Sequence, residues 1–207
     1  MRYRYCVIKN KLFRFLLLVV IGLAVAGLIT YMQIKSEKTS AQTSIVASNF
    51  GGPLNLIDHQ GKIFTNKDFE GGQYRLIYFG FTYCPAICPT ELQRMATVLK
   101  DLGDKGKVIT PYFITVDPER DTQNIMAKYV EMFHPRLIGL TGSLKQIEQA
   151  KKSYKIYAAK VQDETMNDYT MDHSSFIYFI DPQNSLLRVF KADDSVEDIT
   201  KIIQHYL

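Results

Sequence analysis

The sequence predicts the α/β fold class, with a mixed β-sheet and helices on both of its faces, in a domain that follows one apolar N-terminal segment. Two observations carry this prediction. From residue 50 to residue 207, short apolar runs of strand length alternate with longer segments of helical periodicity, and a hairpin and a last helix follow them. Hydrophobic residues make up 46% of the chain and aromatic residues 12%, enough apolar surface to exclude a disordered protein.

The charge of the chain is concentrated at its N-terminal end. The 207 residues include 25 Lys and Arg against 21 Asp and Glu, for a net charge of +4. Five of the cations precede the apolar segment, namely Arg2, Arg4, Lys9, Lys11 and Arg14. The rest of the chain therefore has 20 cations and 21 acids, without the basic surplus that neutralising phosphates requires. We expect no nucleic-acid partner.

The apolar segment, residues 15–34, contains no charged side chain. At about 1.5 Å per residue, a helix of this length spans the roughly 30 Å hydrocarbon core of a bilayer, so we expect a transmembrane anchor. The apolar core of a cleavable signal peptide is shorter, at roughly 7–15 residues. Cleavage is the alternative, because Ala24 and Ala26 offer small residues at the required spacing.

The flanking charges predict the orientation of this anchor. Lys and Arg in short loops resist translocation, so the basic segment of residues 1–14 is expected to stay in the cytoplasm. We expect a bacterial inner membrane with the C-terminal domain in the periplasm; a mitochondrial inner membrane is the alternative. Residues 35–49 are polar and rich in hydroxyl groups, which predicts a tether. The domain is then expected to span residues 50–207.

The first elements of the domain are predicted from turn residues and apolar runs. Residues 54–57 and 62–64 flank a turn at Gly61 and predict a hairpin, and residues 75–82 predict a buried strand. Residues 90–102 predict a helix, with Thr90 as its cap and Gly103 at its end.

The remaining elements follow in the same alternation. A helix over residues 122–133 has Asp121 or Thr122 as its expected cap. The other helices are predicted over residues 144–152 and 196–206, and the strands over residues 108–116, 137–140, 154–161, 176–180 and 186–190.

Two cysteines lie four residues apart between the predicted strand and helix. Side chains at this spacing in a helical turn share one face, and the N-terminus of a helix lowers a thiol pKa, so Cys84 and Cys88 could share a metal or form a disulfide. Pro89 disfavours helical backbone at Cys88, so we expect the pair on a turn or loop, with the helix beginning at Pro89 or Thr90. A structural disulfide is the alternative, although closing so small a loop stabilises little.

His173 is a candidate third donor, because two thiolates leave a metal under-coordinated and imidazole is a natural further ligand. It precedes the strand predicted over residues 176–180, and a hydrogen-bonded structural histidine is the alternative. For the other histidines, His59, His134 and His205, we expect structural roles.

Three motifs in order resemble one family. These are GFTYCPAICPTEL at residues 80–92, VDPERDT at residues 116–122 and YTMDHSSFIYFID at residues 169–181. With them, residues 50–207 resemble the Sco/SenC copper chaperones of cytochrome c oxidase assembly, which are thioredoxin-like domains tethered to a membrane by one N-terminal helix. Without the resemblance, Asp117 and Asp121 of the second motif are expected to be ordinary strand-exit and helix-cap residues.

The resemblance implies a thioredoxin-like fold and a copper site. By resemblance, Cys84, Cys88 and His173 are the ligands of Cu(I) or Cu(II), and the protein delivers copper to the binuclear copper centre of cytochrome c oxidase. The implied partners are the oxidase subunit that holds this centre and an upstream copper donor or thiol reductant. A carrier of this kind is not an enzyme. Asp172, beside the histidine, could orient it or serve as a docking charge.

Other functions remain open on the residues alone. The main alternative is a thiol–disulfide oxidoreductase that keeps the copper-site cysteines of the oxidase reduced. A structural zinc site would require four protein ligands, and three are evident. A peroxiredoxin-like peroxidase is disfavoured by the four-residue cysteine spacing and the histidine.

Overall fold

The computed structural model describes residues 18, 20–23, 25–28, 30, 50–69, 72–162 and 169–207. The chain divides into two units, Met1–Val46 and Ala47–Leu207. The described residues of the first unit are helical, and no helix in the described part of the chain is long and apolar enough to cross a membrane. The predicted basic segment at 1–14, the tether at 35–49 and part of the anchor predicted at 15–34 lie outside the described residues.

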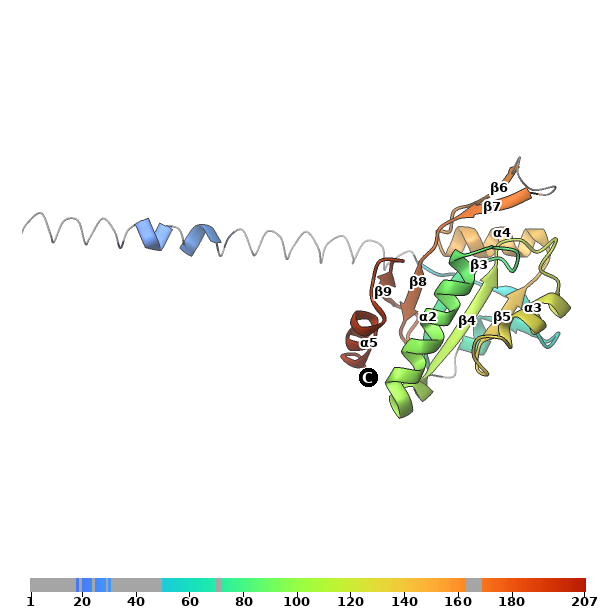
Figure 1. Ribbon diagram of the computed structural model, residues 1–207, viewed down its shortest axis with the longest axis horizontal. Coiled ribbons are helices and arrows are strands. Elements are labelled where there is room, and N and C mark those ends of the chain that lie inside the picture. The colour runs from blue at the N-terminus through green and yellow to red at the C-terminus, as the bar shows by residue number, and fades with distance from the viewer. Residues whose placement is uncertain are drawn as a thin grey trace, which may run out of the picture. The chain divides into compact units, whose positions relative to one another are not determined.

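The described part of the second unit contains a seven-stranded mixed sheet in the order β2-β1-β5-β4-β3-β8-β9 (Figure 1). The central strands β3, β4 and β5 run parallel, and β1 and β8 flank them antiparallel. This arrangement confirms the predicted mixed sheet. The strands are β1 (Asn55–Asp58), β2 (Ile63–Thr65), β3 (Tyr74–Gly80), β4 (Ile109–Thr115), β5 (Ile138–Thr141), β8 (Ile177–Ile180) and β9 (Leu186–Phe190).

One face of the sheet is covered by three helices. Helix α2 (Ile87–Leu102) joins β3 to β4 and α3 (Gln123–Val130) joins β4 to β5, so right-handed crossovers place both on the same side. The ring of Phe113 in β4 contacts Tyr129 of α3 at 5.5 Å between centroids. Helix α5 (Val196–Gln204) packs beside α2, as Figure 1 shows.

The opposite face is covered by α4 (Leu144–Ser153). Phe79 of β3 points to this face, because successive side chains of a strand alternate. Its ring lies 5.4 Å from that of Tyr154, the residue that follows α4. Helices therefore lie on both faces of the sheet, as the sequence predicts.

Several predicted boundaries are confirmed by turn chemistry. The hairpin of β1 and β2 turns at Gly61, whose φ is 88°, a conformation that glycine adopts without strain. Helix α2 ends at Leu102, and Gly103 follows it with a φ of 56°. Glycine after the last helical residue is the predicted stop signal.

The predicted start of α2 is wrong. The helix begins at Ile87, so Cys88 lies in its first turn and not on a loop. Pro89 is tolerated there, because N–H groups in the first turn have no acceptor within the helix and the missing donor costs no hydrogen bond. Thr90 does not cap the helix; its hydroxyl donates to the carbonyl of Ala86 at 2.8 Å.

The segment before β8 also differs from prediction. The single strand predicted over 154–161 is β6 (Ala158–Gln162), preceded by the buried side chains of Tyr154 and Ile156. A strand that the sequence did not predict, β7 (Tyr169–His173), pairs antiparallel with β6. This two-stranded hairpin lies outside the main sheet. The 3₁₀ helices η1 (Asn66–Phe69) and η2 (Gly103–Val108) were not predicted either.

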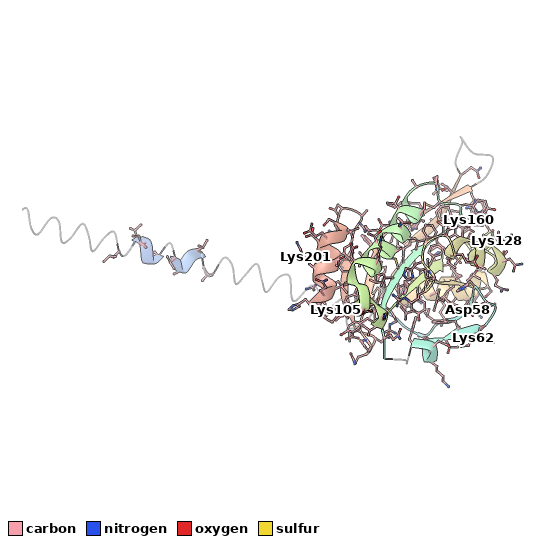
Figure 2. All side chains as sticks on the ribbon, turned by 60° about the horizontal axis from the view of Figure 1, so that its bottom comes forward. Asp58, Lys62, Lys105, Lys128, Lys160 and Lys201 are labelled. Atoms are coloured by element: carbon pink, nitrogen blue, oxygen red, sulfur yellow. The ribbon has the colours of Figure 1, made fainter. Side chains whose placement is uncertain are left out.

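Charged side chains are distributed over separate elements of the domain. Among the lysines labelled in Figure 2, Lys201 and Lys105 lie at one end of the view of the domain, and Lys128 and Lys160 lie at the other. They belong to α5, η2, α3 and β6.

Candidate metal centre

The structure brings Cys84, Cys88 and His173 together. One ligand atom of each residue lies within 4.8 Å of the others, and among the described residues this is the one such group of His, Cys, Asp and Glu side chains. Cys84 lies in the loop after β3, Cys88 is the second residue of α2, and His173 is the last residue of β7. Two sulfurs and one imidazole nitrogen therefore converge from three elements.

Gly80, the last residue of β3, allows the first turn of α2 to approach the sheet. A Cβ atom at this position would lie 2.8 Å from Cys88 Sγ and 3.0 Å from the ring of Phe113. Real Cβ contacts of this length are essentially absent from proteins, so any side chain here would displace the thiol. The glycine thus fixes how closely Cys88 can approach the strand.

The two thiols differ in protonation. The backbone N–H of Cys88 donates to Cys84 Sγ at 3.4 Å, at the positive end of the α2 dipole. A hydrogen bond from the Cys88 side chain is the largest of several that lower the pKa of Cys84 to about 4. The same interaction and then burial raise the pKa of Cys88. At neutral pH the pair holds one proton, with Cys84 as thiolate and Cys88 as thiol.

His173 faces the sulfurs through one defined ring nitrogen. Its Nε2 lies 3.5 Å from Cys88 Sγ, and its Nδ1 lies 3.0 Å from the carbonyl oxygen of Ser174. When Nδ1–H donates to this carbonyl, Nε2 presents its lone pair toward the sulfurs, which is the tautomer that a metal ligand requires. The ring of Phe81 packs edge-on against the imidazole at 5.7 Å.

Arg120 links the loop after β4 to both segments that carry the candidate ligands. Its guanidinium stacks on the Tyr169 ring at 3.8 Å and donates to the Tyr169 carbonyl at 2.8 Å, at the start of β7. It also lies 5.0 Å from the ring of Tyr83, next to Cys84. Asp117 pairs with the Arg120 Nε at 2.6 Å and accepts the Tyr169 hydroxyl at 2.8 Å.

Asp121 ties the cysteine loop to the end of β4. This buried carboxylate accepts the N–H of Thr82 at 3.0 Å, the Thr82 hydroxyl at 2.6 Å and the Thr115 hydroxyl at 2.6 Å. Burial raises the pKa of Asp121, against these hydrogen bonds. The expected role of helix cap is therefore wrong for Asp121, which holds two segments together instead, and Thr122 occupies the N-cap of α3.

Sequence reasoning thus missed the positioning roles of Asp117, Arg120 and Asp121. The signal for them was the match of VDPERDT to the family pattern, since nothing local in the sequence indicates which distant segments these side chains contact. Asp172 is exposed and lines, with Cys84, Met171 and His173, an open depression beside the three candidate ligands. Through this depression the site is open at the surface of the domain.

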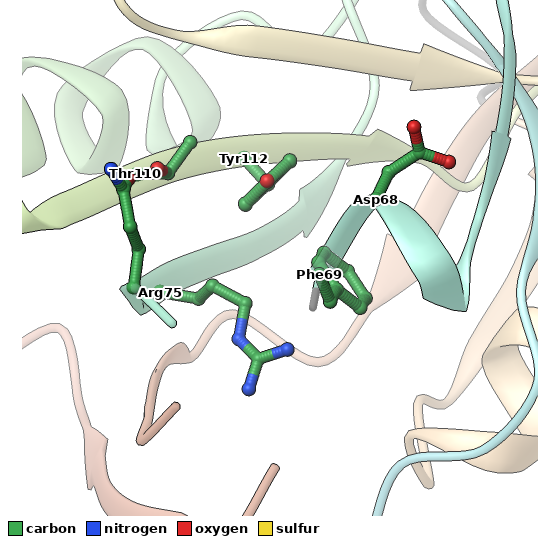
Figure 3. A pocket seen from close by; sticks show the side chains of 6 residues that line it. Asp68, Phe69, Arg75, Thr110 and Tyr112 are labelled. Atoms are coloured by element: carbon green, nitrogen blue, oxygen red, sulfur yellow. Dashed lines mark hydrogen bonds between the residues drawn. The ribbon is translucent and has the colours of Figure 1, made fainter. Parts of the chain in front are cut away.

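A second, smaller pocket lies at the start of β3 and β4 (Figure 3). Its lining includes Arg75, Thr110 and Tyr112, and the Arg75 guanidinium lies 4.6 Å from the centroid of the Phe69 ring. No Cys or His is among its described lining residues, so the candidate metal centre remains the group around Cys84.

Comparisons with known sequences identify close relatives. The SCO1/SenC family model matches residues 42–207. The SCO2-like protein of Rickettsia felis is 38% identical over 187 residues, which cover 89% of this chain and 91% of that protein. The mitochondrial SCO2 homolog of Bos taurus is 42% identical over 158 residues, covering 75% of this chain and 59% of the bovine protein.

Comparisons with solved structures agree. ScoI of Arabidopsis thaliana with copper bound matches with a TM-score of 0.71 at 40% identity, over 76% of this chain and 99% of that one. BsSco, described as a member of the Sco family of cytochrome c oxidase assembly proteins with a disulfide switch, matches with a TM-score of 0.59 at 25% identity, over 76% of this chain and 93% of that one.

The fold is the thioredoxin-like α/β fold, with its mixed sheet flanked by helices. On sequence and structure together, the chain belongs to the SCO1/SenC family.

Proposed function

We propose that this chain is a membrane-anchored copper carrier that delivers copper to the binuclear copper centre of cytochrome c oxidase, with Cys84, Cys88 and His173 as the copper ligands. The observation that carries the proposal is the convergence of two sulfurs and one imidazole within 4.8 Å. Relatives solved with copper bound, from Arabidopsis thaliana and Bradyrhizobium japonicum, support copper as the cargo.

The chemistry of the donor set fits copper. Thiolates are soft ligands that favour Cu(I), and imidazole suits both copper oxidation states. Three protein donors give Cu(I) a trigonal site, whereas Cu(II) would take a further ligand such as water. A structural zinc site would require a fourth protein ligand. The open depression beside Cys84 and His173 lets a partner reach the cargo, as a carrier requires.

Copper loading requires reduced thiols, and both cysteines are free in the structure. Because Cys84 is already a thiolate at neutral pH, loading has to remove one proton, from Cys88.

The partners proposed are the oxidase subunit that holds the copper centre and an upstream copper donor or thiol reductant. The proposed anchor is residues 15–34, with the domain on the periplasmic side of a bacterial inner membrane, and the Rickettsia relative supports a bacterial setting.

The second candidate function is thiol–disulfide exchange, and the unequal thiols favour it. Cys84 is a thiolate that is 9% exposed, whereas Cys88 is fully buried and protonated. In such a pair Cys84 would attack a substrate disulfide, forming a mixed disulfide and releasing one substrate thiolate. Cys88 would then lose its proton and attack Cys84 Sγ, releasing the second substrate thiol and leaving a Cys84–Cys88 disulfide.

Copper analysis of cysteine variants tests the carrier proposal. The full chain, purified in detergent and reduced without oxygen, is expected to hold about one copper, because the described residues offer one set of three donors. Cys84→Ser and Cys88→Ser should each lose stable binding. Cys6→Ser, which changes the third cysteine of the chain, is the matched control and should bind normally. Full copper retention by either site variant would contradict the ligand assignment.

A further inference from the structure

The phenol of Tyr78 lies against the buried thiol of Cys88. Its oxygen is 3.7 Å from Cys88 Sγ and 2.9 Å from the hydroxyl oxygen of Ser175. The tyrosine is in the middle of β3, fully buried, with its ring stacked on Phe113 at 6.3 Å between centroids. The ring is therefore held by its neighbours, and the hydroxyl has little freedom to move away from the sulfur.

The Ser175 hydroxyl can orient the phenol proton of Tyr78. A tyrosine hydroxyl has one proton to donate, and a phenol keeps that proton at neutral pH. When the Ser175 hydroxyl donates to the phenol oxygen, the phenol proton is directed to Cys88 Sγ. Ser175 lies two residues after His173, so one short segment supplies both the imidazole and the hydroxyl that orients Tyr78.

We propose that Tyr78 is a positioning residue of the site: its O–H donates a hydrogen bond to Cys88 Sγ, and through this bond it stabilises the reduced, copper-binding dithiol over the disulfide. The copper half of this inference rests on the proposed function, in which Cys88 is a ligand. The thiol half rests on the contacts of Tyr78 alone.

The physical reason is the charge on the acceptor. Hydrogen bonds to charged acceptors are stronger than those to neutral ones. The reduced pair carries one negative charge, which the hydrogen bond from Cys88 to Cys84 shares between the two sulfurs, and a copper-bound sulfur also carries negative charge. Sulfur in a disulfide is nearly neutral. Loss of the phenol proton should therefore weaken the reduced form selectively. At a sulfur distance of 3.7 Å the bond is modest, so we expect an effect of about threefold to tenfold.

The same bond should affect the electronic state of a loaded site. A hydrogen bond lowers the energy of the sulfur electrons, so more energy is needed to move one of them to Cu(II). Without the bond, the thiolate-to-Cu(II) absorption should shift to longer wavelength. A role limited to filling space in the core would leave this absorption unchanged.

The test is a redox titration of the full chain in detergent, in a Cys6→Ser background so that Cys84 and Cys88 alone react. Two electrons and the one proton of the reduced pair pass to oxidised dithiothreitol, which takes its second proton from the solvent, as the protein disulfide forms and that of the reagent opens. Tyr78→Phe should shift this equilibrium about threefold to tenfold toward the protein disulfide. Ser175→Ala should shift it less in the same direction, and Ser175→Thr, which keeps the hydroxyl, should match the parent.

Tyr178→Phe is the matched control. Tyr178 is also buried, but it pairs with Ile77 in the sheet register and so faces the side opposite to Tyr78, where it contacts Phe50 and Phe79. Equal equilibria and equal absorption for Tyr78→Phe and Tyr178→Phe would overturn the proposal. If Tyr78→Phe does not fold, an unshifted Ser175→Ala overturns it instead. Failure of the parent chain to bind copper would contradict the proposed function, while the titration would still decide the role of Tyr78.

Discussion

The Nε2 atom of His173 lies 3.5 Å from the Sγ atom of Cys88, although the two residues are 85 positions apart. The contact forms because the β6–β7 hairpin leaves the main sheet and ends, at His173, over the first turn of α2. The sulfurs are fixed by α2 and β3, whereas the imidazole is on a hairpin that pairs with no other strand in the described residues. The contacts that hold the hairpin should therefore decide whether the site keeps three donors.

Replacing Arg120 by lysine should loosen this hairpin. Lysine keeps the charge but lacks the planar guanidinium, which stacks on Tyr169 and donates to its carbonyl. We expect Arg120→Lys to lower Cu(II) affinity by about tenfold, which corresponds to about 1.4 kcal/mol. Competition with a chromophoric chelator measures this affinity. The control is Arg188→Lys, which changes an arginine of β9 that lies near the ring of Tyr206. Equal Cu(II) affinities for the two variants would argue against a positioning role for Arg120.

Replacing Asp121 by asparagine should destabilise the domain. The carboxylate accepts three hydrogen bonds from Thr82 and Thr115. In asparagine an NH₂ group replaces one carboxylate oxygen, so N–H donors would face at least one of these threonine donors. The expected loss is about 1–3 kcal/mol of unfolding free energy, measured by urea denaturation. Asp104→Asn, at an exposed ion pair with Lys107, should change stability by less than about 0.5 kcal/mol. If Asp121→Asn lowered the unfolding free energy no more than Asp104→Asn does, Asp121 would not hold the cysteine loop to the end of β4.

The reactivity of Cys84 should be almost independent of pH near neutrality. Its pKa is lowered from 9.0 to about 4, so the thiolate fraction is complete well below pH 6. In a Cys6→Ser background, alkylation of Cys84 by iodoacetamide should therefore proceed at a constant rate from about pH 6 to pH 8. The Cys88→Ser variant lacks the side chain whose hydrogen bond lowers the pKa of Cys84 most, so the alkylation rate of this variant should rise with pH. An approximately tenfold rise per pH unit with Cys88 present would indicate an ordinary thiol.

The proposed orientation of the anchor predicts the location of the C-terminus. The cations before residue 15 should keep the N-terminal end in the cytoplasm, because basic flanks resist translocation. A reporter enzyme that is active only in the periplasm should be active when fused after Leu207. A reporter active only in the cytoplasm, fused at the same position, is the control and should be inactive. The reverse result would overturn the topology.

The local chemistry of the sequence was enough to predict most of the fold. Gly61 and Gly103 mark a turn and a helix end that depend on their own backbone conformation, so both were predicted. The start of α2 was missed because Pro89 restrains the residue before it, yet a proline is tolerated in the first turn of a helix. In α2 the proline is tolerated, because the helix begins two residues before it and Pro89 lies in the first turn.

The parts of the site that sequence reasoning missed depend on contacts between distant segments. Strand β7 has polar residues such as Thr170 and Asp172 between its larger side chains, and it pairs with β6 alone, so no buried apolar run marked it. Arg120 acts on Tyr169, 49 positions away, and no local pattern encodes such a pairing. The cysteines could be singled out by their spacing, whereas the choice of His173 needed the donor count and the family resemblance.

The measurement that tests the central claim most directly is oxidase activity in a strain from which this protein has been deleted and to which the His173→Ala variant is supplied. Two thiolates can still hold Cu(I) in a nearly linear site, but Cu(II), which prefers nitrogen and more ligands, should be lost or strongly weakened. The variant should keep a titratable Cys84–Cys88 disulfide, lose the thiolate-to-Cu(II) absorption and fail to restore oxidase activity, whereas the control His205→Ala, at the end of α5, should restore it. Normal oxidase assembly with His173→Ala, together with failure of Cys84→Ser, would contradict copper delivery and favour thiol reduction.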